Sequence, residues 1–134
     1  GLCQVSTTIY RAAMNAGLPI DSIKNHSLYI KYYKKHGDGL DATIFPGFQD
    51  LSFENNLEHP ILIQTYTTAK NKLITVMYSK SDAKQVNLIG PIYSSNQNAF
   101  PDIEVEKNQI KWIREFEDGT ESEIFTSTYN QTVG

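Results

Sequence analysis

The sequence lacks any hydrophobic run long enough to cross a membrane, and it lacks a surplus of basic residues. Its apolar runs are short, far below the roughly 18 to 20 consecutive residues that a bilayer-spanning helix needs. Lysine and arginine number 12 against 15 aspartates and glutamates, a formal net charge of -3. Nucleic acid binding requires concentrated positive charge, so nucleic acid is not expected as a partner. Any membrane contact is expected only through segments outside this sequence.

Cysteine is nearly absent: Cys3 is the single cysteine among the 134 residues. One thiol cannot form an intramolecular disulfide or build a thiolate zinc site, so no disulfide framework is expected. A metal site built from His26, His36 and Asp41 is conceivable, but these residues have no recognised ligand spacing. We therefore expect no metal and no cofactor. The chain opens at Gly1 without a methionine, which favours a portion of a longer protein.

The first residues predict an amphipathic helix from Leu2 to Ala16 that ends at Gly17. At about 100° per residue, its apolar residues form one stripe that is expected to face the core. This stripe consists of Leu2, Val5, Ile9, Ala12, Ala13 and Ala16. The opposite face, predicted to meet solvent, consists of Gln4, Thr8, Arg11 and Asn15. A mixed flank lies between them and contains Cys3, Ser6, Thr7, Tyr10 and Met14.

After this helix the sequence is typical of short strands separated by turns. Extended segments are predicted at 26–33, 41–45, 51–55, 60–67, 73–79, 86–89, 92–93, 103–107, 110–116 and 120–129. Asn71-Lys72 and Asp118-Gly119 indicate two hairpins, the second being the stronger signal. The sequence thus predicts an α+β fold, in which one cysteine-bearing helix packs on an antiparallel sheet. Residues 1–79 are expected to form the core of the domain. Residues 80–134 are expected to form a β-rich extension, either as a separate unit or as part of the same domain.

The position of Cys3 in the first turn of the helix favours chemistry at the thiol. Unpaired backbone N–H groups and the positive end of the helix dipole stabilise a thiolate there. A cysteine nucleophile also needs a base and a group that orients the base. His26 and Asp41 are the candidates, since both occupy predicted strand starts whose ends can lie beside the helix N-terminus. A small buried hydrophobic cysteine is the alternative interpretation.

Further polar and aromatic residues are candidates for binding a substrate. Gln4, or the backbone N–H groups of residues 1–4, would stabilise an oxyanion. Ser6 and Tyr10 would shape a ligand pocket beside the thiol. Tyr33 belongs to a stretch of tyrosines and lysines, 29–35, that would line a groove for sugar or peptide, or would instead form a lysine-guarded edge strand. Trp112 is predicted to belong to the core of the terminal hairpin.

Several segments together resemble the VanW-like family. They are Gly1–Tyr10, Ala16–Leu18, His26–Ser27, Gly39–Thr43, Phe53–Asn56 and His59–Ile63. The resemblance extends from Gly1 to about Ser79, and residues 103–134 are similar to the G5-like module that often follows this domain. Two departures stand out: Lys24 occupies a position where many members have a second histidine, and the 34–38 loop lacks the usual prolines.

The resemblance implies an extracytoplasmic protein of the Gram-positive cell envelope, associated with glycopeptide (vancomycin) resistance or peptidoglycan. With the residue pattern it suggests thiol chemistry on cell-wall peptide, as a cysteine-dependent hydrolase or transferase. Peptidoglycan or its peptide stems would be the partner. The alternative is a non-catalytic module that binds the cell wall or a partner, with the β extension as a spacer or adhesive surface.

Overall fold

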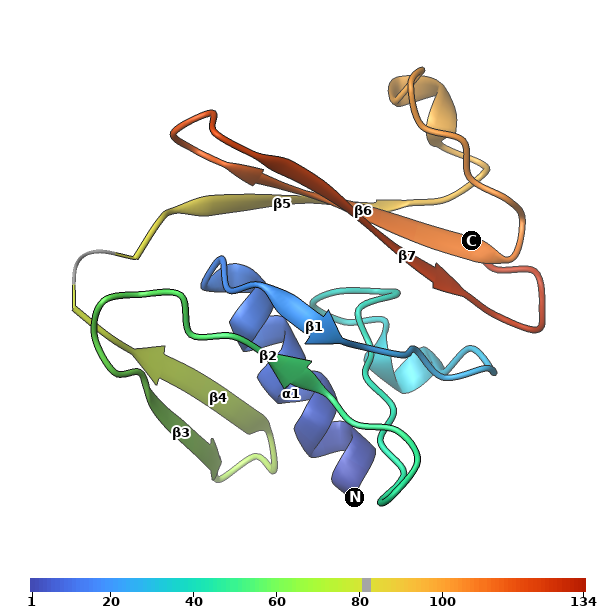
Figure 1. Cartoon of the computed structure of the whole chain (residues 1–134). Helices are drawn as coiled ribbons and strands as arrows, with labels where there is room; N and C mark the ends of the chain where they lie inside the picture. The colour runs from blue at the N-terminus through green and yellow to red at the C-terminus, as the bar shows by residue number, and fades with distance from the viewer. Residues whose placement is uncertain (81–82) are drawn as a thin grey trace.

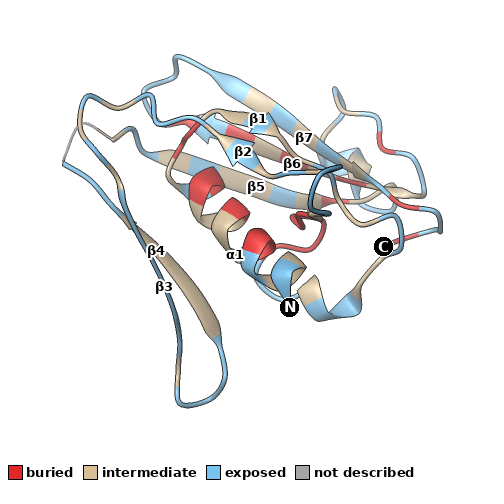
Figure 2. Cartoon of the chain, turned by 60° about the horizontal axis from the view of Figure 1, so that its bottom comes forward, coloured by how far each residue is buried: buried red, intermediate tan, exposed pale blue. Residues whose placement is uncertain are grey.

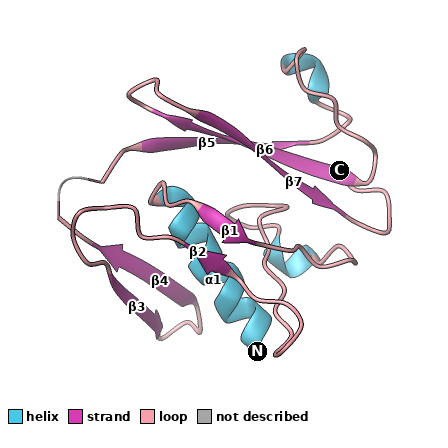
Figure 3. Ribbon diagram, in the orientation of Figure 1, coloured by secondary structure: helices cyan, strands magenta, loops and turns pink. Residues whose placement is uncertain are grey.

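The computed structural model describes residues 1–80 and 83–134, which form an α+β fold with one α-helix and antiparallel strand pairs among these residues (Figures 1 and 3). The predicted fold class is confirmed. The elements are α1 (Leu2–Asn15), β1 (Ile20–Ser22), a 3₁₀ turn (Lys31–Tyr33), β2 (Ser52–Phe53), β3 (Leu62–Thr67), β4 (Leu73–Tyr78), β5 (Val86–Ile92), a second 3₁₀ turn (Gln97–Ala99), β6 (Gln109–Phe116) and β7 (Ser122–Thr128).

The helix α1 lies between two β layers (Figure 1). A three-stranded sheet of order β5-β6-β7 covers one side, and the β3-β4 hairpin lies against the other, where β4 contacts α1. The short β1-β2 pair lies beside α1, and together they form the layer below the β5-β6-β7 sheet in Figure 1. Both predicted hairpins are confirmed, with Thr67 opposite Leu73 in the first and Glu115 opposite Ser122 in the second.

The buried face of α1 differs from the predicted one. Its buried residues are Ser6, Thr7, Tyr10, Ala13 and Met14, which largely form the mixed flank. Two residues of the predicted apolar stripe, Leu2 and Val5, are exposed. The reason is hydrogen bonding: Ser6 Oγ donates to the Ala42 carbonyl oxygen at 2.6 Å, and the Ala42 N–H donates to Thr7 Oγ1 at 3.0 Å. These hydroxyls satisfy an irregular buried backbone, which an apolar stripe cannot do.

Three of the segments predicted to be extended form no strand. Residues 26–33 form a loop that ends in the 3₁₀ turn, residues 41–45 are unpaired except for a single bridge at Phe45, and residues 103–107 form no ladder with another segment. In the first two segments the backbone bonds to side chains and to other loops instead of a neighbouring strand. The Thr43 N–H, for example, donates to the Lys24 carbonyl oxygen at 2.8 Å. The two pieces predicted at 86–89 and 92–93 are instead one strand, β5.

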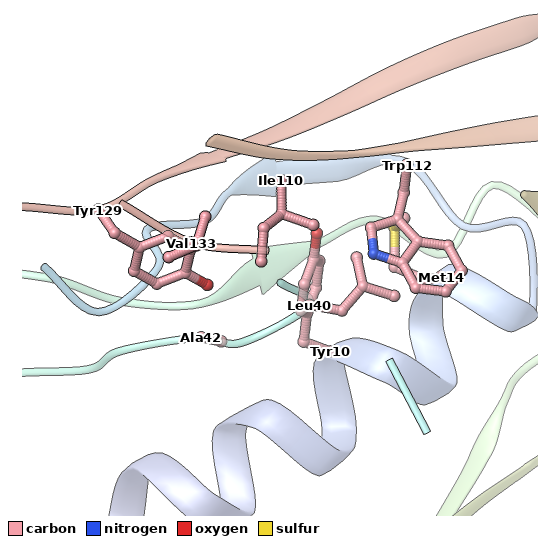
Figure 4. Packing of buried hydrophobic residues seen from close by; sticks show 8 residues of the cluster. All are labelled: Tyr10, Met14, Leu40, Ala42, Ile110, Trp112, Tyr129 and Val133. Carbon is pink, nitrogen blue, oxygen red and sulfur yellow. The ribbon is translucent and has the colours of Figure 1, made fainter. Parts of the chain in front are cut away.

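The hydrophobic core lies between α1 and the β5-β6-β7 sheet (Figure 4). It contains Tyr10, Met14, Leu40, Ala42, Ile110, Trp112, Tyr129 and Val133. Trp112 is thus in the core, as predicted, and its indole N–H donates to the Asp38 carbonyl oxygen at 2.7 Å. The core takes half of its residues from 1–79 and half from 80–134. The predicted division of the chain at this point remains a prediction.

Burial is concentrated on the sheet side of α1, whereas the β3-β4 hairpin is open to solvent (Figure 2). Every residue of β3 is exposed, and those of β4 are at most partly buried. The hairpin therefore contributes little to the core. Positions on its surface provide neutral control sites for variants made elsewhere in the chain.

The close approach of Gly39 to β6 gives a first prediction. Gly39 has φ +88°, and a Cβ there would lie 2.6 Å from Ile110 Cγ2. Gly47 has a similar φ of +84° with open space around it, so Gly47→Ala isolates the backbone strain. We expect Gly39→Ala to lower the free energy of unfolding by about 1 to 3 kcal/mol more than Gly47→Ala, because the new Cβ forces Ile110 to shift in the core. Urea unfolding of both variants measures this difference. Equal costs would show that Ile110 moves aside freely.

Candidate functional site

The imidazole of His26 and the carboxylate of Asp41 form a close pair next to the N-terminal half of α1. His26 Nδ1 lies 2.6 Å from Asp41 Oδ2, and the same oxygen accepts the backbone N–H of His26 at 2.7 Å. Asp41 is 3% exposed and His26 is half-buried. Two bonds to one carboxylate oxygen fix both the backbone and the ring of His26. This arrangement leaves Nε2 as the ring nitrogen available to another group.

The second carboxylate oxygen is held by Tyr129, a residue that the sequence analysis did not propose for the site. The Tyr129 hydroxyl donates to Asp41 Oδ1 at 2.5 Å. Burial raises the pKa of Tyr129, as does its hydrogen bond with Asp41, so the phenol stays a donor. Tyr129 directly follows β7, and no sequence spacing signals that it reaches a residue 88 positions earlier. The part of the chain beyond residue 79 thus contributes a residue that supports the site from inside the protein.

Cys3 lies in the first turn of α1, whose N-cap is Gly1 and where no side chain caps the helix. Its Sγ lies 3.7 Å from Thr43 Oγ1 and 3.6 Å from the Ile44 carbonyl oxygen. The pKa of the Cys3 thiol is lowered from its ordinary value, chiefly by the Ile44 backbone and further by His26 and Thr43, although partial burial opposes this. The contact with the Ile44 carbonyl oxygen acts in the opposite direction, because a carbonyl oxygen accepts a hydrogen bond from the thiol and does not stabilise a thiolate. The thiol is half-buried.

His26 and Cys3 influence each other in a reciprocal way. Burial lowers the pKa of His26, but its hydrogen bond with Asp41 and its interaction with Cys3 raise it by more, so the net pKa lies above the ordinary value. A raised imidazole pKa beside a lowered thiol pKa is the direction that a thiolate–imidazolium pair produces. Both sites titrate as a pair in such an arrangement.

Tyr33 stacks on the His26 ring, with a centroid distance of 5.6 Å and an interplanar angle of 29°. The segment that carries Tyr33 is held by Arg11, which the sequence analysis placed on the solvent face of α1. The side chain is instead half-buried. The guanidinium donates to four backbone carbonyl oxygens, those of Tyr33 at 2.7 Å, Leu40 at 2.8 Å, Lys35 at 3.0 Å and Gly37 at 3.0 Å. Arg11 thereby shapes the loop that leads to Asp41.

The remaining predicted binding residues occupy different places. Gln4 is half-buried, and its Nε2 donates to the Tyr32 hydroxyl at 2.7 Å. Ser6 and Tyr10 are buried, at 5% and 3% exposure, where Ser6 bonds to backbone and Tyr10 belongs to the core. The structure therefore brings Cys3, His26, Asp41 and Tyr33 together. It places Ser6 and Tyr10 beneath them, inside the protein.

A groove with a volume of about 570 Å³ begins at His26 and Thr43, the residues next to the thiol. Its lining continues along the loop after His26 and along the turn at 45–49. Among the described residues, no group of three or more His, Cys, Asp and Glu is arranged to hold a metal ion. Within the same part of the chain, no helix has the length and apolar character needed to span a membrane.

The fold and the site together define a class: an α+β domain with a cysteine at a helix start and a histidine–aspartate pair at the edge of a groove. Residues 1–78 match the model of the family described as "VanW like protein", and the chain belongs to this family. It is similar to the uncharacterized protein YoaR of Bacillus subtilis (strain 168), with 35% identity over 79 residues. That alignment covers 59% of this chain and 25% of YoaR. No solved structure matches.

Membership of this family supports, at the level of the family, a protein of the cell envelope associated with vancomycin resistance. The predicted resemblance is confirmed over the residues that carried it. The matched region ends at residue 78, so the likeness of residues 103–134 to a G5-like module stays a prediction.

Proposed function

We propose that this chain is the thiol-bearing domain of an extracytoplasmic protein in a Gram-positive cell envelope, and that it acts on the peptide portion of peptidoglycan. Cys3 is the nucleophile, His26 the base and Asp41 the residue that orients the base. One observation carries the proposal: Cys3 and His26 shift each other's pKa in the directions of an ion pair, while Asp41 holds the histidine at 2.6 Å. Family membership supports the location.

In the proposed reaction the Cys3 thiol gives its proton to His26, and Sγ attacks the carbonyl carbon of a peptide bond. The C–N bond then breaks, the amine leaves with the proton from His26, and an acyl thioester remains on Cys3. Water or a second amine releases the acyl group and restores the thiol. The backbone N–H groups of the first turn of α1 are the candidate donors to the oxyanion, because no side chain caps them.

The test is the rate of alkylation by iodoacetamide as a function of pH. We expect the wild-type rate to rise with a midpoint clearly below about 8.5, the ordinary thiol value, because the thiolate is the reacting species. His26→Gln should move that midpoint upward, since it removes the positive charge that stabilises the thiolate. The sign follows from the lowered pKa of Cys3.

The matched control is His36→Asn, which removes another imidazole outside this site. Asparagine tolerates the positive φ of 65° at this position, so the fold should be unaffected. If the alkylation rate of the wild type has its pH midpoint at the ordinary thiol value and neither variant changes it, the proposal that Cys3 is activated is contradicted.

The second candidate function is a non-catalytic module that binds the cell wall or a protein partner. It is favoured by the contact of Sγ with the Ile44 carbonyl oxygen at 3.6 Å, because an unreactive thiol would donate its proton there. In this function the sheet β5-β6-β7 would serve as a spacer or adhesive surface. An inert cysteine in the alkylation experiment supports it.

A further inference from the structure

The groove beside the thiol has an apolar wall that the core does not require. Phe45, Phe48 and Leu28 line it and are 61%, 84% and 62% exposed. The two phenyl rings contact each other, with centroids 5.1 Å apart. Isolated exposed apolar residues are common on proteins, but a group that lines one concave surface next to reactive side chains indicates a ligand site.

The backbone holds this wall in place. The Phe45 N–H donates to the Gln49 carbonyl oxygen, and the N–H groups of Phe48 and Gln49 donate to the Phe45 carbonyl oxygen, each at 2.9 Å. These three backbone hydrogen bonds fix the turn that carries both phenyl rings. A preformed wall costs a ligand less conformational entropy than a wall that must be ordered on binding.

The charges of the groove restrict its ligand further. Its lining contains the charged side chain of Lys24 and no carboxylate, although the whole chain has a formal charge of -3. Its charge is complementary to an anion and unfavourable for a cationic ligand.

We propose that the groove binds the acyl side of a peptide substrate that combines an apolar side chain with a carboxylate. The apolar side chain lies against Phe45, Phe48 and Leu28, the carboxylate faces Lys24, and the carbonyl carbon to be attacked lies between Cys3 and His26. This assignment rests on the proposed function, since it places the reacting carbonyl at the thiol. It adds the chemical class of the substrate, which follows neither from Cys3, His26 and Asp41 nor from the family.

The experiment compares the reactions of three alkylating probes with Cys3 in the chain of residues 1–134. Iodoacetamide is the reference, N-iodoacetyl-L-phenylalanine carries an aromatic group and a carboxylate, and N-iodoacetyl-L-phenylalaninamide carries the same group without the charge. Each probe reports a second-order rate at Cys3. The ratio of two rates for one protein cancels the intrinsic reactivity of the thiol, so recognition by the groove is measured separately from thiol activation.

We expect the phenylalaninamide probe to react roughly tenfold faster than iodoacetamide with the wild type, because burying part of an aromatic ring is worth about that factor. Phe48→Ser should bring this ratio close to one. The carboxylate probe should exceed the amide probe by roughly threefold at low salt, as a solvent-exposed charge pair allows. Lys24→Gln should remove that difference alone.

Leu62→Ser and Lys70→Gln are the matched controls, because they remove an exposed apolar residue and a lysine from the β3-β4 hairpin and its turn. Neither should change the ratios. Wild-type ratios near one, or ratios that Phe48→Ser and Lys24→Gln leave unchanged, would overturn the assignment even if iodoacetamide detects an activated thiol. Selective ratios with an ordinary thiol midpoint would support the groove as a binding site and overturn the catalytic function.

Discussion

Asp41→Ala is expected to lower the free energy of unfolding by about 3 to 5 kcal/mol and to slow alkylation of Cys3 at neutral pH by roughly tenfold or more. Asp41 is almost fully buried and accepts hydrogen bonds from the His26 backbone, the His26 ring and the Tyr129 hydroxyl. Alanine leaves three donors without an acceptor, the buried hydroxyl of Tyr129 and the two partly buried N–H groups of His26. It also removes the charge that raises the pKa of His26. Urea unfolding and the iodoacetamide rate measure the two effects.

Asp41→Asn separates charge from shape. Its amide oxygen can accept both bonds from His26, while its NH₂ group faces the Tyr129 oxygen, which can accept. We therefore expect a smaller stability loss, about 1 to 2 kcal/mol, together with a clear upward shift in the pH midpoint of alkylation. A stability loss as large as that of alanine would show that the charge of Asp41, and not its shape, provides its contribution to stability. An unchanged midpoint would show that its charge does not reach the thiol.

Arg114→Met is expected to lower the free energy of unfolding by about 3 kcal/mol. Arg114 is 1% exposed, and its guanidinium donates to Glu123 Oε1 at 2.9 Å and to the Leu18 carbonyl oxygen at 3.0 Å. It also donates to the Met14 carbonyl oxygen at 3.3 Å, and so caps the end of α1 from β6. Methionine fills similar volume but supplies no donor. Thermal unfolding should show a Tm lower by roughly 10 °C.

Two further variants control this result. Glu123→Gln should cost less, about 1 kcal/mol, because Glu123 is partly exposed and the guanidinium keeps its bonds to α1. Arg114→Lys should fall between the two, since a single ammonium cannot reach both the carboxylate and the helix end. We also expect all variants to unfold in one transition, because the core joins both ends of the chain. Two transitions would show that the extension unfolds separately.

The strands that sequence patterns predicted well are those whose signals are local. The hairpin at Asp118-Gly119 and the one at Asn71-Lys72 depend on turn residues and on alternating side chains within a few positions. Trp112 was predicted to be a core residue, and it lies on the buried face of β6 together with Ile110 and Phe116. Arg114 lies on that same face and was missed, because only its contacts with Glu123 and the end of α1 make a buried guanidinium tolerable.

The face of α1 could not be predicted in the same way. Apolar periodicity favours Leu2 and Val5 as buried residues, yet the irregular backbone at Ala42 requires hydroxyl groups, and Ser6 and Thr7 supply them. The role of Arg11 depends equally on a loop that exists only in the folded protein. Periodicity measures hydrophobic burial, and it contains no information about which backbone groups lack partners.

By itself the sequence determined the fold class, the two hairpins, the family, and the candidate set of Cys3, His26 and Asp41, because each depends on local residue pattern or on residues in a fixed order. Only the tertiary structure decided that these three residues meet, that Tyr129 holds Asp41, and that a groove with apolar walls begins at His26. The physical reason is that these contacts join residues 15 to 88 positions apart, whose approach is fixed by packing of the whole core and not by any local preference.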